Sequence, residues 1–139
     1  MARLLTVIAA LLLMVHPALG QNRLSVGDPA PKIEIATWVK GEPIPEFVPG
    51  HVYVVEFWAT WCPPCKKSIP HLTEIQTKFK GKATIIGISA KDANGETLER
   101  VQKHVAGAGD SMAYTVAFDD GSKTNQAYMV AARQRGIPT

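Results

Sequence analysis

The feature that most constrains the fold is an apolar run that leads directly into the two cysteines of the chain. Residues 52–58 read VYVVEFW, and the chain continues ATWCPPC, with the cysteines at positions 62 and 65. Alternate positions place Glu56 on one face of an extended chain, where the other side chains are apolar. The opposite face is apolar throughout. This pattern predicts a strand that is covered on both sides and lies in the middle of an α/β sheet.

A helix is expected to begin immediately after this strand. It runs from Pro63 to about Phe79, because apolar side chains recur on one face of a helix drawn over these residues. Proline suits the first helical turn, where its missing N–H would have no partner. Pro70 should kink the helix, since it removes a backbone donor inside it. Gly81 is expected to end it.

The rest of the chain alternates between short apolar strands and amphipathic helices. Strands are predicted at 33–38, 83–89 and 114–118, a loop at 41–49, a turn at 107–110, and helices from Asn94 or Thr97 to about Ala106 and from Lys123 to about Arg133. Strands that alternate with helices are typical of an α/β fold. We therefore expect a mostly parallel central sheet with helices on both faces.

The amino terminus has the pattern of a secretory signal peptide over residues 1–20. Arg3 precedes a short apolar run, and small residues stand before a cleavage point expected after Gly20. An uncleaved anchor helix is the alternative, but the run is short for a bilayer span. Residues 21–32 are expected to form an extended lead-in, and residues 33–139 one domain. Export would place this domain in a periplasmic or other extracytoplasmic compartment, without stable membrane insertion after cleavage.

The charge of the chain is too small to indicate a nucleic-acid partner. The formal net charge is +3, and it becomes +2 when Arg3 leaves with the signal segment. The lysines and arginines are scattered along the sequence rather than clustered. We therefore expect no nucleic acid among the partners.

The C-x-x-C spacing of the cysteines allows a structural bond, a metal site or a redox couple. A bond across so small a loop would constrain the unfolded chain little. A zinc site needs about four ligands, and the histidines outside the signal segment, at 51, 71 and 104, are not spaced as ligand pairs. Redox chemistry is therefore favoured, and no metal or organic cofactor is expected.

The two cysteines should be chemically unequal. Cys62 would lie at the helix N-terminus, where free N–H groups and the helix dipole favour a thiolate. Cys65 would lie one turn further into the helix and be more shielded. This asymmetry predicts that Cys62 attacks a partner disulfide and that Cys65 resolves the mixed disulfide.

Glu56 is expected to serve the cysteine pair as a proton acceptor. Its neighbours on the same strand face are apolar, so the carboxyl group should be buried and its pKa raised. A group of this kind can take or give the proton that Cys65 must lose or gain. The alternative is an exposed acid near a strand end.

The segment FWATWCPPCK at residues 57–66 resembles the active site of the thioredoxin superfamily, most closely the exported TlpA/ResA-like thiol–disulfide oxidoreductases. Pro70 matches the kinking proline of that family's active-site helix. Gly27–Pro31 resembles the lead-in of redoxin and TlpA-like domains, and Gly136–Thr139 resembles the family's cis-proline loop. The resemblance covers residues 26–139 and implies a thioredoxin-like fold.

The resemblance also implies further site residues and partners. Ile137 and Pro138 would contact the substrate chain, together with Trp61 and Pro63 on either side of Cys62. The partners would be protein disulfides or dithiols and a membrane thiol that donates electrons, and the protein would act as a monomeric reductant. Family members continue beyond the proline loop through a hairpin and a final helix, which these 139 residues do not contain.

Two alternatives stay open from the sequence. One is a thiol peroxidase of the redoxin or peroxiredoxin type, although its Thr-x-x-Cys spacing is one residue longer than Thr60-Trp61-Cys62. The other is a non-enzymatic carrier that holds copper between the two thiols.

Overall fold

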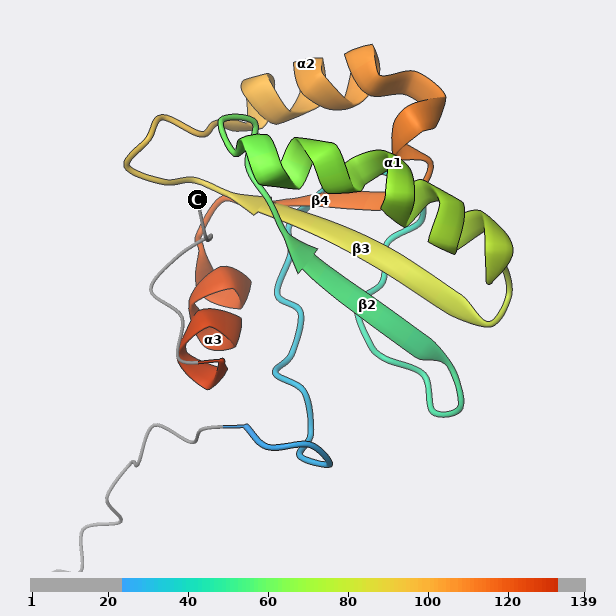
Figure 1. The fold of residues 1–139 in the computed structure, drawn as a ribbon. Coiled ribbons are helices and arrows are strands. Elements are labelled where there is room, and N and C mark those ends of the chain that lie inside the picture. Colours follow the sequence, from blue (N-terminus) through green and yellow to red (C-terminus); the bar gives the residue numbers. More distant parts are fainter. Residues whose placement is uncertain (1–23, 133–139) are drawn as a thin grey trace, which may run out of the picture.

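The computed structural model describes residues 24–132, which form a four-stranded sheet with helices on both sides (Figure 1). The strands are β1 (Thr37–Lys40), β2 (Val52–Phe57), β3 (Ala83–Ala90) and β4 (Thr115–Asp119); the helices are α1 (Pro63–Lys78), α2 (Leu98–Ala108), the short 3-10 helix η1 (Gly109–Met112) and α3 (Lys123–Ala131). The expected signal peptide at 1–20 and the proline loop with Ile137 and Pro138 lie outside the described residues.

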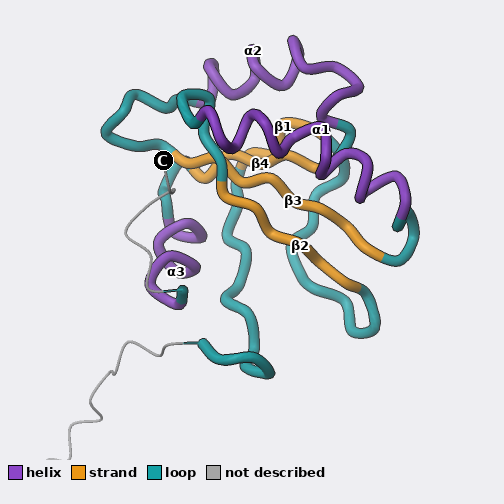
Figure 2. The backbone as a smooth tube through the Cα atoms, in the orientation of Figure 1, coloured by secondary structure: helices purple, strands orange, loops and turns teal. Residues whose placement is uncertain are grey.

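The sheet has the strand order β1-β4-β3-β2 (Figure 2). The β2–β3 and β3–β4 pairs are parallel, whereas β1 runs antiparallel to β4. Helices α1 and α2 cover one face, and α3 lies against the other (Figure 1). The predicted α/β fold, with a mostly parallel sheet between helices, is confirmed.

Each face of the sheet has its own apolar core. Under α1 and α2 the core is built around Trp58, Ile69, Ile85, Val101, Val105, Met112, Tyr114, Val116 and Phe118. On the other face, Ile33, Ile86, Ile88 and Ala117 pack with partly buried apolar side chains from residue 35, β1, the 41–51 loop and β2. The side chains of β2 therefore alternate between the two faces as predicted, with Tyr53, Val55 and Phe57 on the second face.

The predicted position of β2 in the middle of the sheet is wrong for the described residues. Within residues 24–132, β2 pairs with β3 alone and forms an edge of the sheet. Val52 and Val54 keep 59% and 38% of their surface exposed. Apolar character on both faces of a strand does not reveal how many neighbours the strand has, because pairing depends on where distant segments dock.

The first strand is shifted from its predicted range. Residues 33–36 are not in the sheet, and β1 begins at Thr37. Ile33 is buried in the second core, while the Glu34 N–H donates to Thr124 Oγ1 in α3 at 2.8 Å. This segment is therefore held by a helix rather than by a strand ladder.

The helices begin where the sequence predicts, but two of them end differently. The C-cap of α1 is Phe79 rather than Gly81, and α2 continues to Ala108, into the turn predicted at 107–110. Helix α1 contains Pro70 and continues to Lys78. Thr97, rather than Asn94, caps α2, and its side chain accepts the Arg100 N–H. Between residues 24 and 132, every helix falls short of the length and apolar character that a membrane crossing requires.

Candidate redox-active site

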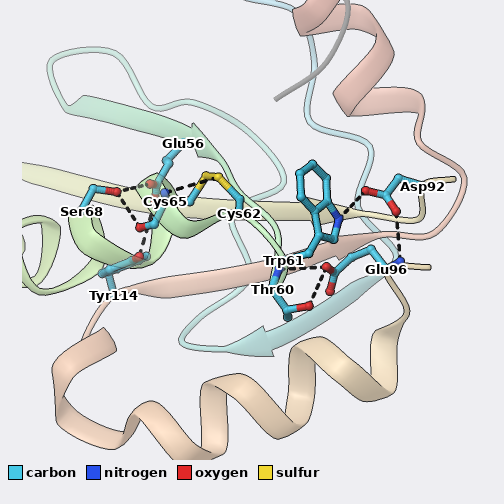
Figure 3. Close-up of a disulfide and its surroundings, with 9 residues drawn as sticks. All are labelled: Glu56, Thr60, Trp61, Cys62, Cys65, Ser68, Asp92, Glu96 and Tyr114. Atoms are coloured by element: carbon cyan, nitrogen blue, oxygen red, sulfur yellow. Dashed lines mark hydrogen bonds between the residues drawn. A yellow bond between two sulfur atoms is a disulfide. The ribbon is translucent and has the colours of Figure 1, made fainter. Parts of the chain in front are cut away.

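Cys62 and Cys65 form a disulfide at the N-terminus of α1 (Figure 3). Cys62 is the N-cap residue, and its Sγ accepts the Cys65 N–H at 3.3 Å. Pro63 and Pro64 occupy the first helical turn, where proline costs no backbone hydrogen bond. The Cys62 sulfur thus lies where helix N–H groups would stabilise a thiolate after reduction.

The exposure of the two cysteines is the reverse of the expectation. Cys62 is fully buried, with 0% of its surface exposed, whereas Cys65 is half-buried. The position of a residue at a helix start does not reveal which distant segments pack over it, and this packing decides its exposure. The expectation of an exposed Cys62 and a shielded Cys65 is therefore wrong for the disulfide form. Pro63 is exposed and Trp61 is half-buried beside the pair.

Glu56, on β2, accepts hydrogen bonds from two hydroxyl groups, one of them on α1. The Ser68 hydroxyl is 3.0 Å from Glu56 Oε1 and also 2.8 Å from the Cys65 carbonyl oxygen, which connects Glu56 to the cysteine turn (Figure 3). The Tyr114 hydroxyl donates to Glu56 Oε2 at 3.4 Å. Burial raises the pKa of the Glu56 carboxyl group, and the hydrogen bonds from Ser68 and Tyr114 partly oppose this shift. The side chain is half-buried rather than fully buried, in keeping with the edge position of β2.

Two further acids, Asp92 and Glu96, hold the loop that leads into Cys62. Glu96 Oε2 accepts both the backbone N–H and the hydroxyl of Thr60, each at 2.8 Å. Asp92 Oδ2 accepts the Trp61 Nε1–H at 2.7 Å, and Asp92 Oδ1 accepts the Glu96 N–H at 3.0 Å. Glu96 is fully buried. The segment after β3 therefore fixes both residues that precede Cys62 (Figure 3).

Sequence reasoning missed four of these residues: Ser68, Tyr114, Asp92 and Glu96. Ser68 had a local signal, because it stands three residues after Cys65 and so one helical turn away. The other three residues had no local sequence signal, because they follow the cysteines by about 27 or more residues and reach the site only through the packing of β3 and β4.

A groove of about 690 Å³ between α1 and α2 opens next to this loop. Its lining includes Lys66, Arg100, Lys103 and His104. His104 packs against the Trp58 ring with 5.3 Å between centroids. Burial lowers the pKa of His104, and the charge of Lys66 lowers it further, whereas Glu96 acts in the opposite direction. Positive charge therefore borders the cysteine helix on this side.

In residues 24–132, no three histidine, cysteine or acidic side chains converge in a way that could hold a metal ion.

The fold and the cysteine pair at the start of α1 define a thioredoxin-like protein, and comparisons with known proteins agree. Residues 26–139 match the family described as AhpC/TSA, so the chain belongs to the AhpC/TSA family. The thiol–disulfide oxidoreductase ResA of Bacillus cereus is 32% identical over 112 residues, which cover 79% of this chain and 61% of that relative. The chain thus spans less than two thirds of the length of ResA.

Solved structures show the same fold. A thiol-disulfide isomerase from Corynebacterium glutamicum superposes with a TM-score of 0.61 and 25% identity, over 78% of this chain and 75% of that one. StoA from Bacillus subtilis superposes with a TM-score of 0.58 and 21% identity, over 79% and 78% of the two chains.

Proposed function

We propose that this protein is an enzyme that exchanges dithiol for disulfide with protein partners through Cys62 and Cys65. The observation that carries this proposal is the disulfide at the start of α1, where Cys62 Sγ accepts the Cys65 N–H and Glu56 connects to the same turn through Ser68. The ResA relative is itself named a thiol–disulfide oxidoreductase. No organic cofactor is needed for this chemistry.

The first step begins from the reduced protein. The Cys62 thiolate, stabilised by the N–H groups at the start of α1, attacks one sulfur of the partner disulfide. A bond forms between Cys62 and that sulfur, and the other partner sulfur leaves as a thiolate that takes a proton from solvent. Because Cys62 is buried in the disulfide form, its sulfur must become accessible on reduction. Trp61 and Pro63 flank it and would contact the partner, as would Ile137 and Pro138.

The second step releases the partner. Cys65 transfers its thiol proton to Glu56, and its thiolate then attacks the Cys62 sulfur. The Cys62–Cys65 disulfide forms, and the partner sulfur leaves as the second thiolate. In total the partner disulfide gains two electrons, and the protein dithiol loses them. A carboxyl group with a raised pKa suits this exchange, because it holds a proton closer to neutral pH than an ordinary glutamate.

The proposed direction is reduction of partners outside the cytoplasm. The signal-like residues 1–20 support export, and the absence of a histidine at the position of Pro64 favours a reductant over a strong oxidant. A membrane thiol would then return electrons to the protein, which would act as a monomer. A reduction potential for the Cys62–Cys65 couple close to that of thioredoxin, about −270 mV, supports this direction, and one close to about −120 mV refutes it.

The activity is tested with a disulfide-bonded protein substrate and a thiol donor. The Cys65→Ser variant should stall as a mixed disulfide through Cys62 that a reductant releases, whereas Cys62→Ser should form none by this route. If Cys65→Ser traps no partner, the exchange mechanism is wrong. Consumption of hydrogen peroxide by Cys65→Ser would favour the peroxidase alternative. A stoichiometric copper ion that blocks exchange in the reduced protein would favour the carrier.

A further inference from the structure

Tyr114 reaches Glu56 from the far side of the neighbouring strand. Glu56 lies directly opposite Gly87 in the parallel β2–β3 pair, and Gly87 lies opposite Val116 in the β3–β4 pair. Tyr114 precedes Val116 by two residues, so it lies on the same face of the sheet. The Tyr114 side chain must therefore cross β3 to reach Glu56, and its ring passes beside Gly87.

Gly87 leaves the space that this crossing needs. A methyl group built on Gly87 would lie 2.9 Å from Tyr114 Cε2 and 3.2 Å from Trp58 Nε1. Contact at 2.9 Å with a ring held in the core would force the ring to move. The Tyr114 ring is nearly fully buried, with 4% of its surface exposed, yet its hydroxyl reaches Glu56 Oε2 at 3.4 Å.

The two oxygens of Glu56 consequently have different neighbours. Oε2 faces the hydroxyl of Tyr114, the residue before β4, and Oε1 faces the Ser68 hydroxyl from α1. Ser68 has a single hydroxyl proton and two acceptors, Glu56 Oε1 and the Cys65 carbonyl oxygen. When Glu56 is ionised, Ser68 can donate to Oε1. When Glu56 is protonated, Oε1–H can donate to the Ser68 oxygen, and the Ser68 hydroxyl can donate to the Cys65 carbonyl oxygen.

We propose that Tyr114 is a positioning residue for proton transfer, whose hydroxyl binds Glu56 Oε2 and leaves Oε1, beside Ser68 and the cysteine turn, to carry the exchanged proton. This inference rests on the proposed function. Within the described residues, the Glu56 carboxyl group accepts hydrogen bonds from Ser68 on α1 and from Tyr114 just before β4, and of these two only Tyr114 is titratable. Its paired residue in β3, Gly87, has no side chain. Burial and the nearby Glu56 carboxyl group raise the pKa of Tyr114, so the hydroxyl stays protonated and remains a donor at physiological pH.

The test compares two tyrosine-to-phenylalanine variants of the oxidised protein. Tyr114→Phe removes the hydroxyl and keeps the ring, so the core should stay packed. The matched control is Tyr128→Phe, because Tyr128 also donates one hydroxyl hydrogen bond, to the Pro31 carbonyl oxygen at 3.0 Å. Tyr128 lies on the other face of the sheet, where its ring packs against Phe57. The Glu56 carboxyl group is titrated by carbon-13 NMR, a measurement that does not require exchange activity.

Tyr114→Phe should raise the pKa of Glu56 by about 0.5–1 pH unit, because the ionised form loses a donor. Tyr128→Phe should leave it unchanged. The proposal is overturned if both variants titrate like the wild type, or if both shift equally. Gly87→Ala, which displaces the ring, should shift the Glu56 pKa in the same direction as Tyr114→Phe, and a Gly87→Ala titration like that of the wild type would also count against the proposal.

The kinetic test separates this inference from the proposed function. In Tyr114→Phe, the part of the pH–rate profile for disulfide exchange that depends on Glu56 should shift to higher pH by the same amount, about 0.5–1 pH unit. In a Glu56→Gln background, Tyr114→Phe should have no further effect, and an undiminished effect there would refute the route through Glu56. If the wild type exchanges no disulfides, the proposed function fails, while the NMR titration still decides the role of Tyr114.

Discussion

Replacement of Glu96 by alanine should loosen the loop that positions Cys62. Glu96 Oε2 accepts two hydrogen bonds of 2.8 Å from Thr60, one from the backbone N–H and one from the side-chain hydroxyl. Alanine removes this acceptor and leaves a half-buried backbone N–H without its partner. Because Thr60 is two residues before Cys62, the change should affect both global stability and the environment of the disulfide.

The expected cost follows from the bonds that are lost. Hydrogen bonds to a charged acceptor contribute about 1.5–3 kcal/mol each, so two contribute about 3–6 kcal/mol. Part of this cost is offset, because Glu96 Oε1 is buried without a hydrogen-bond partner. Removal of an unsatisfied buried group returns about 1–3 kcal/mol. The middle of each range, about 4.5 kcal/mol lost and about 2 kcal/mol returned, leaves a net destabilisation of about 2.5 kcal/mol.

Urea unfolding of the oxidised protein measures this change, with tryptophan fluorescence as the signal. Glu99→Ala is the matched control, because Glu99 is an exposed acid in the first turn of α2, three residues after Glu96, and should change stability by less than about 0.5 kcal/mol. Glu96→Gln should recover part of the loss, since its amide oxygen can still accept from Thr60. Equal stabilities of Glu96→Ala and Glu99→Ala would refute this account of the loop.

Three further predictions follow from the packing and the electrostatics. Gly41→Ala should cost about 1–3 kcal/mol more than Gly50→Ala in urea unfolding, because both glycines have a positive φ but only the methyl group at position 41 meets Thr115 Oγ1, at 2.6 Å; equal costs would contradict this. Ile69→Ala should lower the free energy of unfolding by about 2–5 kcal/mol, since Ile69 is 4% exposed in the first core, and a loss below about 0.5 kcal/mol would argue against that packing. Glu56 keeps its proton to higher pH when folded than when unfolded, so its contribution to stability is full below about pH 4.5 and is lost as pH rises through the raised pKa. Glu56→Gln should therefore gain stability relative to the wild type as pH rises from about 4 to about 8, and a pH-independent difference in unfolding free energy would contradict the shift.

Local patterns in the sequence predicted the elements that carry the cysteines. An apolar strand over 52–58 and a proline at the first helical position were enough to place Cys62 at a helix N-terminus and Cys65 one turn inside it. These properties depend on backbone preferences and on the spacing of apolar residues over a few turns. The alternation of strands and helices was likewise sufficient to predict a mostly parallel sheet. Pro138 and Ile137 stay predictions, because they lie outside the described residues.

The tertiary structure decided what surrounds those cysteines. It placed β2 at the edge of the sheet within residues 24–132 and turned the Cys62 side chain inward. It also brought Tyr114 across Gly87 to Glu56 and placed Glu96 against Thr60. These contacts join residues 36 or 58 positions apart in the chain, and their geometry depends on the register of β3 and β4 rather than on any local pattern. The sequence by itself therefore determines that the cysteine pair lies at the start of a helix. The docking of distant strands determines how deeply the two cysteines are buried and which groups bind Glu56.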